Sequence, residues 1–122
     1  MTLSQKIRSP EIRSREIHYR HGKLGVEDVS METLAQAVGT PLYAYSQSAI
    51  LRQLKELRSA LRGIPHTLCF AAKACSNLSI LRLLAKSGVG VDVVSGGELF
   101  RAKRAEFPPS RIVFSGVGKT SE

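Results

Sequence analysis

Three short apolar segments, spaced about 22 residues apart, restrict the fold of this chain more than any other feature. They lie at 67–72, 89–94 and 111–114, and each has the length of a buried strand. Apolar residues at helical spacing fill the two intervals between them. Strands that alternate with helices in this way predict a βαβαβ unit with parallel strands. We therefore expect an α/β fold.

This α/β unit is too small to stand as a whole fold. Parallel strands need cover on both faces, and three of them cannot close a barrel. A (β/α)8 barrel of the TIM type takes about 250 residues, whereas this chain has 122. We therefore interpret the chain as the first part of a larger fold.

Local capping signals mark both helices of the unit. Asn77 is a suitable N-cap for the first helix, and Gly88 ends it. Ser95, with Glu98 three residues later, forms a capping box at the start of the second helix. These signals place each helix start directly after a strand.

The first half of the chain gives weaker signals. Residues 1–15 show no periodic pattern, and we interpret them as a flexible basic arm. The remaining expected elements are a strand at 16–19, a Gly22-Lys23 turn, a strand at 24–26, a helix at 31–38 between Ser30 and Gly39, a strand at 42–45, and a helix from 46 to the stop at Gly63.

The net charge of the chain is +8, and half of it lies in residues 1–23. A basic arm can bind nucleic acid, but no recognition helix or aromatic stacking surface accompanies this one. We therefore expect a solvated arm and no nucleic-acid partner. No apolar run has the length of a membrane span or of a secretory signal. With Cys69 and Cys75 read as reduced thiols, these features indicate a cytoplasmic protein.

Lys73 is the leading candidate for chemistry. It follows the first apolar strand, and in parallel α/β folds the functional groups lie at the carboxyl ends of strands. Ser95 and Ser115 hold the same place after the second and third strands. A desolvated lysine has a lowered pKa, and its neutral amine can form a Schiff base with an aldehyde. The alternative, an exposed lysine at a strand end, stays open.

Asp92 is the second candidate, because it lies inside the second strand. A buried carboxylate without a partner is costly, so Asp92 needs a cation or hydrogen-bond donors. Lys73 on the neighbouring strand is the obvious cation. Backbone donors, which would make Asp92 purely structural, are the alternative.

Other motifs are weaker. The segment 115–120 ends in Gly-Lys-Thr, but a P-loop would need a further glycine at Val113, inside the strand. Gly96-Gly97 could bind an anion, although Glu98 in its capping role favours a structural helix start. The three histidines have no ligand or triad spacing, and no metal site is expected.

The chain resembles the N-terminal part of the diaminopimelate decarboxylases, in the pyridoxal-phosphate decarboxylase family that also holds ornithine and arginine decarboxylases. The resemblance extends over about residues 16 to 122. Five motifs carry it: His21-Gly22-Lys23-Leu24-Gly25-Val26-Glu27-Asp28-Val29, Thr40-Pro41-Leu42-Tyr43-Ala44-Tyr45, Phe70-Ala71-Ala72-Lys73-Ala74, Asp92-Val93-Val94-Ser95-Gly96-Gly97-Glu98-Leu99 and Arg111-Ile112-Val113-Phe114-Ser115-Gly116-Val117-Gly118-Lys119-Thr120.

The resemblance implies a barrel with a separate β-domain. Residues 16–45 would then be the lead-in segment of the β-domain, and 46–122 the first part of the cofactor-binding barrel. It also implies pyridoxal 5′-phosphate as cofactor, Lys73 as the catalytic lysine bound to it, and Asp92 as a cofactor-binding residue nearby. Cys75 stands where the family commonly has asparagine, which leaves Lys73 unaffected.

The implied function is decarboxylation of meso-2,6-diaminopimelate to L-lysine by a homodimeric enzyme that takes a small amino-acid substrate. The chain by itself is expected to be inactive, since the phosphate loops and most of the barrel would come from later residues. The alternatives are another basic amino acid as substrate, such as ornithine or arginine, or a non-catalytic regulatory relic that docks on a full-length paralogue.

Overall fold

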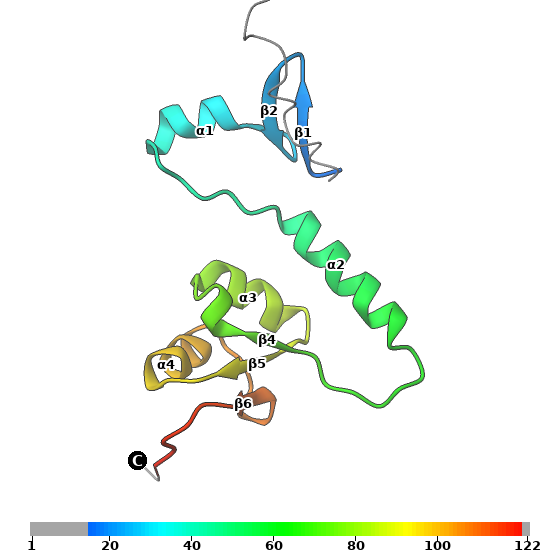
Figure 1. Ribbon diagram of the computed structural model, residues 1–122, viewed down its shortest axis with the longest axis vertical. Helices are drawn as coiled ribbons and strands as arrows, with labels where there is room; N and C mark the ends of the chain where they lie inside the picture. Colours follow the sequence, from blue (N-terminus) through cyan, green and yellow to red (C-terminus); the bar gives the residue numbers. More distant parts are fainter. Residues whose placement is uncertain (1–14, 121–122) are drawn as a thin grey trace, which may run out of the picture. The chain divides into compact units, whose positions relative to one another are not determined.

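The computed structural model describes residues 15–120, which divide between Arg62 and Gly63 into two compact units (Figure 1). The expected arm at 1–15 lies almost wholly outside the described residues. Each unit is built around its own small sheet, one antiparallel and one parallel. The functional candidates all belong to the second unit.

The first unit begins with a three-stranded antiparallel sheet. Its strands are β1 (Ile17–Arg20), β2 (Lys23–Val26) and β3 (Val29–Ser30), in the order β1-β2-β3. The turn between the first two is His21-Gly22, one residue earlier than predicted, because both residues have positive φ and Lys23 pairs with Arg20. Such backbone matches the twist of a tight hairpin.

Two helices complete the first unit, α1 (Met31–Val38) and α2 (Gln47–Ala60). The predicted cap of α1 is confirmed, since the Ser30 side chain accepts a hydrogen bond from the Thr33 amide. The strand predicted at 42–45 is wrong. Those residues form no regular structure after a cis Thr40-Pro41 peptide, and no neighbouring strand among the described residues pairs with them.

Acidic side chains tie the hairpin of this unit to the start of α2. Glu27 Oε1 accepts hydrogen bonds from Ser46 Oγ at 2.7 Å and from the Ser48 amide at 2.8 Å. Glu16 receives two hydrogen bonds from the Arg52 guanidinium, at 2.9 and 3.2 Å. The long separation of these partners in the chain means that tertiary structure, and not local pattern, brings them together.

The second unit is the predicted βαβαβ arrangement. Its elements are β4 (Cys69–Ala71), the short 3-10 helix η1 (Ala72–Ala74), α3 (Leu78–Lys86), β5 (Gly90–Val93), α4 (Gly96–Arg104), the 3-10 turn η2 (Pro109–Arg111) and β6 (Ile112–Phe114). The strands are parallel in the order β4-β5-β6, as predicted. They are shorter than the apolar segments, because 67–68, 72, 89, 94 and 111 lie outside the ladder.

The core of the second unit lies on one face of its sheet. Val91 and Val93 of β5 are fully buried, and both α3 and α4 contact this strand. Side chains alternate between faces along a strand, so Asp92 lies on the opposite face. Its register neighbours there are Ala71 and Val113, and Val113 is 48% exposed. We call this second face, defined by Ala71, Asp92 and Val113, the open face.

Candidate functional site

Lys73 lies in the middle of η1, directly after the carboxyl end of β4. The sequence predicted this place, although the strand was expected to continue through Ala72. Ala72 is fully buried, whereas Lys73 is exposed. The burial that would desolvate the amine is therefore not supplied within the described residues.

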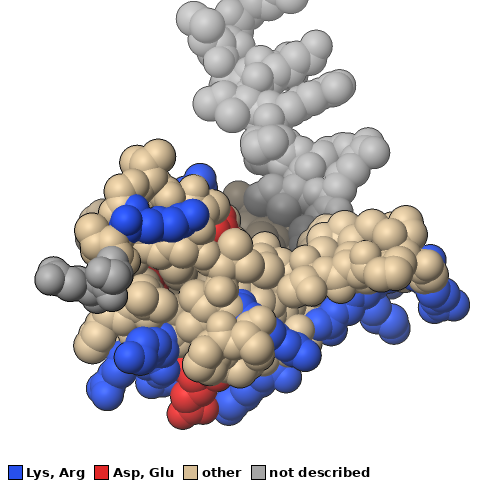
Figure 2. All heavy atoms as spheres, turned by 90° about the horizontal axis from the view of Figure 1, so that it is seen from below, with Lys and Arg blue, Asp and Glu red and all other residues tan. Residues whose placement is uncertain are grey.

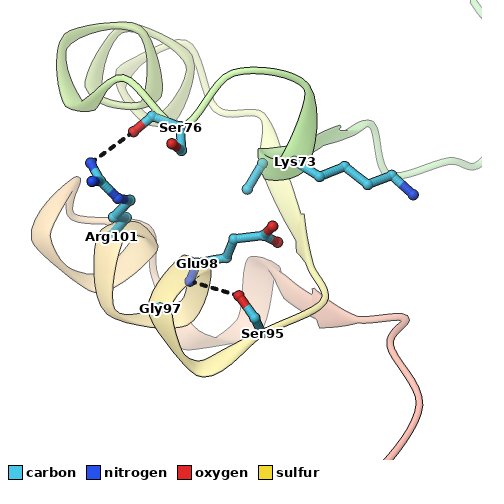
Figure 3. A pocket seen from close by; sticks show the side chains of 7 residues that line it. Lys73, Ser76, Ser95, Gly97, Glu98 and Arg101 are labelled. Atoms are coloured by element: carbon cyan, nitrogen blue, oxygen red, sulfur yellow. Dashed lines mark hydrogen bonds between the residues drawn. The ribbon is translucent and has the colours of Figure 1, made fainter.

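A pocket of about 320 Å³ lies beside the turn that carries Lys73. Its lining comes from η1, the residue before the cap of α3, and the first turns of α4: Ala72, Lys73, Ser76, Ser95, Gly97, Glu98 and Arg101. Figure 3 shows Ser76 and Arg101 across from each other at one end. The Lys73 side chain extends away from both, so its amine lies outside that end of the pocket (Figure 3).

The start of α4 is held by a capping box, as the sequence predicted. Ser95 Oγ accepts from the Glu98 amide at 3.2 Å. The Glu98 carboxylate accepts from the amide of Val94 at 2.8 Å, one residue before the cap. This closes the end of β5 onto the first turn of α4 and satisfies amides that the helix itself cannot bond.

Arg101 was not singled out from the sequence. Its guanidinium Nη1 donates to the backbone carbonyl of Ser76 at 3.2 Å, across 25 positions of the chain. The only sequence signal is that Arg101 follows Glu98 by three residues, which places both on the same helix face. The acceptor is a backbone atom, so no side-chain pattern could have indicated the pair.

Asp92 does not meet the partner expected for it. Its Oδ1 is buried and has no hydrogen-bond partner among residues 15–120, and these residues record no ion pair between Asp92 and Lys73. Ala71, not Lys73, is its register neighbour on β4. An unsatisfied buried carboxylate oxygen is costly. The structure thus leaves a polar group on the open face that requires a further donor.

The third strand end, at Ser115–Lys119, is held by backbone and packing contacts. The Ser115 amide continues the ladder by donating to the Val93 carbonyl at 3.1 Å. A Cβ at Gly116 would come within 2.8 Å of the Val94 carbonyl, so glycine is needed there for close packing. The Lys119 ammonium lies 5.8 Å from the centre of the Phe114 ring. These contacts give the segment a structural role, and the expectation that it is no P-loop remains a prediction.

Several other candidates stay separate from this pocket. Cys69 and Cys75 are free cysteines, and no cluster suited to a metal ion occurs within 15–120. No helix in that range is long and apolar enough to cross a membrane.

Basic side chains stand out on the face shown in Figure 2, with few acidic ones between them. The expectation that the chain binds no nucleic acid remains a prediction.

Comparison with known proteins shows the family to which this chain belongs. Residues 47–122 match a family described as "Pyridoxal-dependent decarboxylase, pyridoxal binding domain". The chain belongs to this family, and its second unit lies wholly within the matched range. The resemblance inferred from the five motifs is confirmed.

Diaminopimelate decarboxylases are among the curated proteins that are similar to this chain. The enzyme of Pseudomonas fluorescens is 50% identical over 105 residues, which are 86% of this chain and 25% of that protein. The enzyme of Aquifex aeolicus is 48% identical over 106 residues, covering 87% and 25% of the two chains. This chain therefore spans about a quarter of the length of the curated relatives it matches.

Solved structures give the same picture. The crystal structure of an Aquifex aeolicus protein matches with a TM-score of 0.79 and 47% identity, covering 86% of this chain and 26% of that one. A diaminopimelate decarboxylase from M. jannaschii in complex with L-lysine matches with a TM-score of 0.81 and 38% identity, covering 87% and 26%. The α/β architecture is thus shared with these enzymes over most of the chain.

The residues present fit a pyridoxal phosphate. The Lys73 amine is exposed and makes no hydrogen bond or ion pair within 15–120, so an aldehyde can reach it without displacing another group. Asp92, whose Oδ1 lacks a hydrogen-bond partner within 15–120, is in direct register with Ala71, two residues before Lys73. A cationic or hydrogen-bonding group placed over the open face would satisfy it.

Proposed function

We propose that the polypeptide carrying these residues decarboxylates meso-2,6-diaminopimelate to L-lysine with pyridoxal phosphate, and that this chain supplies the lysine that binds the cofactor. One observation carries the proposal. An exposed Lys73, which makes no hydrogen bond or ion pair within residues 15–120, lies at the carboxyl end of β4 in a chain of the pyridoxal-binding family that is about half identical to diaminopimelate decarboxylases.

The residues of this chain have separate roles in that reaction. Lys73 would hold the cofactor through its Nζ and, once released from it, would carry a proton at that atom. The negative charge of Asp92 favours the protonated form of groups placed beside it. Bound pyridoxal phosphate supplies the electron sink that accepts the electron pair left by the departing CO₂. Groups beyond this chain would anchor its phosphate.

We propose the finer architecture on the same basis. Residues 46–122 would form the start of a TIM-type barrel, and 16–45 would lead into a separate β-domain. Complete enzymes would be cytoplasmic homodimers. The open face of the second unit supports the barrel, since parallel strands are normally covered on both faces and this one is covered on one.

The test of Lys73 is covalent trapping. The full polypeptide that carries these residues would be expressed, incubated with pyridoxal phosphate and reduced with borohydride. Mass spectrometry would then identify the labelled lysines. We expect label on Lys73 and its loss in Lys73→Ala. Lys86→Ala, which removes another exposed lysine of the same unit, should keep the label. Label spread evenly over surface lysines would contradict the proposal.

The test of the substrate is CO₂ release. The same preparation would be offered meso-2,6-diaminopimelate, ornithine and arginine separately, with Lys73→Ala as the blank. Release from meso-2,6-diaminopimelate alone supports the proposal. Release from ornithine or arginine in its place would move the protein to another branch of the family. No release from any of the three, despite selective labelling of Lys73, would favour a non-catalytic relic.

A further inference from the structure

The turn that carries Lys73 is held at two points. On its amino side, Ala72 is fully buried, and η1 contacts both β5 and α4. On its carboxyl side, the Ser76 carbonyl accepts the hydrogen bond from Arg101. Lys73 lies between these two points, three residues before the second. The position of its backbone therefore depends on α4 as well as on its own strand.

The two attachments differ in kind. Ala72 is buried in a unit whose α4 carries another fully buried alanine, Ala102, so small side chains allow the helix to approach closely. The Arg101 hydrogen bond joins exposed groups and contributes little to global stability. Its loss should leave the unit folded while releasing the carboxyl side of the turn. The effect of Arg101 on the turn can thus be measured separately from any effect on the folding of the unit.

We propose that Arg101 is a positioning residue for Lys73. By holding the Ser76 carbonyl against α4, it fixes the turn in the arrangement from which the lysine amine reaches the cofactor aldehyde. Arg101 itself touches neither the amine nor the reacting atoms. This inference rests on the proposed function for the role of Lys73, but the restraint on the turn is a property of the chain alone.

The α4 helix offers a matched control. Arg101→Met removes the hydrogen-bond donor and one positive charge. Arg104→Met removes the same charge from the same helix and leaves the Ser76 carbonyl bonded, because the donor to that carbonyl is Arg101, whereas Arg104 accepts from Arg82 through its backbone carbonyl. Arg101→Lys keeps a donor of shorter reach and should restore part of any loss. Both positions are exposed, so none of the three substitutions opens a cavity.

Two readouts distinguish the proposal from its failure. The first readout is amide hydrogen exchange of the full gene product without cofactor, followed in a peptide that spans 72–77. It measures how firmly the turn is held. The rate at which Lys73 becomes trapped by borohydride, after pyridoxal phosphate is added, reports on its position. For Arg101→Met we expect exchange about three- to tenfold faster and trapping slower by a similar factor, the size expected for one lost hydrogen bond. Arg104→Met should match the unchanged protein in both.

Specific outcomes would overturn the inference. Unchanged exchange and trapping in Arg101→Met, or equal losses in Arg104→Met, would show that the contact does not position the turn. If Arg101→Met lowers the melting temperature of the protein and Arg101→Lys does not restore it, Arg101 has a structural role only. If Lys73 is not the trapped lysine in the unchanged protein, the proposed function fails, and hydrogen exchange still decides the restraint.

Discussion

At the scale of single residues, the sequence predicted where Lys73 lies but not its surroundings. Its place after β4 follows from the apolar run that precedes it, which is a local property. Two features of its surroundings, its exposure and the lack of a contact with Asp92, depend on which residues pack around the strand end. The local sequence pattern holds no information about that packing. The Arg101 contact was missed for the same reason, because its acceptor is a backbone carbonyl.

The orphaned oxygen of Asp92 gives the first residue-scale prediction. Asp92→Asn removes the charge from a partly buried side chain whose Oδ1 lacks a donor. We expect the 122-residue chain alone, without cofactor, to gain about 1 kcal/mol in its free energy of unfolding, because a neutral amide is cheaper to bury than an unpaired carboxylate. Urea denaturation measures this. Glu106→Gln, an exposed charge in the same unit, should change little. A loss of stability in Asp92→Asn would contradict the inference that the Asp92 carboxylate lacks a hydrogen-bond donor.

At the scale of elements, helix starts were predictable and one strand was not. Ser30, Asn77 and Ser95 each cap the helix that the sequence assigned to them, since a cap needs only its own next three residues. The strand expected at 42–45 failed because a strand needs a hydrogen-bonded neighbour, and alternating side chains do not supply one. Helix α2 also has a distant partner at its start, Glu27.

The Glu27 contacts predict a pH dependence for the start of α2. The Ser46 hydroxyl, followed by the Ser48 amide, holds the pKa of the Glu27 carboxyl below its ordinary value of 4.5. Because the folded-state pKa is lowered, the stabilisation is complete above the ordinary value and is lost as pH falls through the folded value.

Thermal unfolding between neutral and acid pH tests this prediction. Glu27→Gln should lower the melting temperature at neutral pH, and the difference from the unchanged protein should shrink in acid below the ordinary glutamate range. Asp28→Asn removes the neighbouring charge and serves as the control. A difference that persists undiminished in acid would mean that Glu27 acts through packing rather than through its charge.

At the scale of the whole molecule, the parallel order of three strands was predictable because helix-connected strands allow few other arrangements. What covers the open face was not. Leu81 of α3 is fully buried on the covered side, whereas Val113 on the open face is 48% exposed. The two faces should therefore respond differently to truncation.

In the 122-residue chain alone, we expect Leu81→Ala to cost about 2–5 kcal/mol of unfolding free energy, as for other buried leucines. Val113→Ala should cost well below about 1 kcal/mol, because half of its side chain is already in water. Urea denaturation of both variants measures the contrast. Equal losses would mean that something in the 122-residue chain already covers the open face.

The same incompleteness predicts that the 122-residue chain cannot turn over substrate by itself. It spans about a quarter of the curated relatives, and its described residues present one reactive lysine without a covered sheet face around it. Purified alone with pyridoxal phosphate and meso-2,6-diaminopimelate, it should release no CO₂ above the Lys73→Ala blank. A full-length diaminopimelate decarboxylase assayed in parallel verifies the assay. CO₂ release by the short chain would show that one covered sheet face suffices for catalysis, and the role assigned to the missing cover would then be wrong.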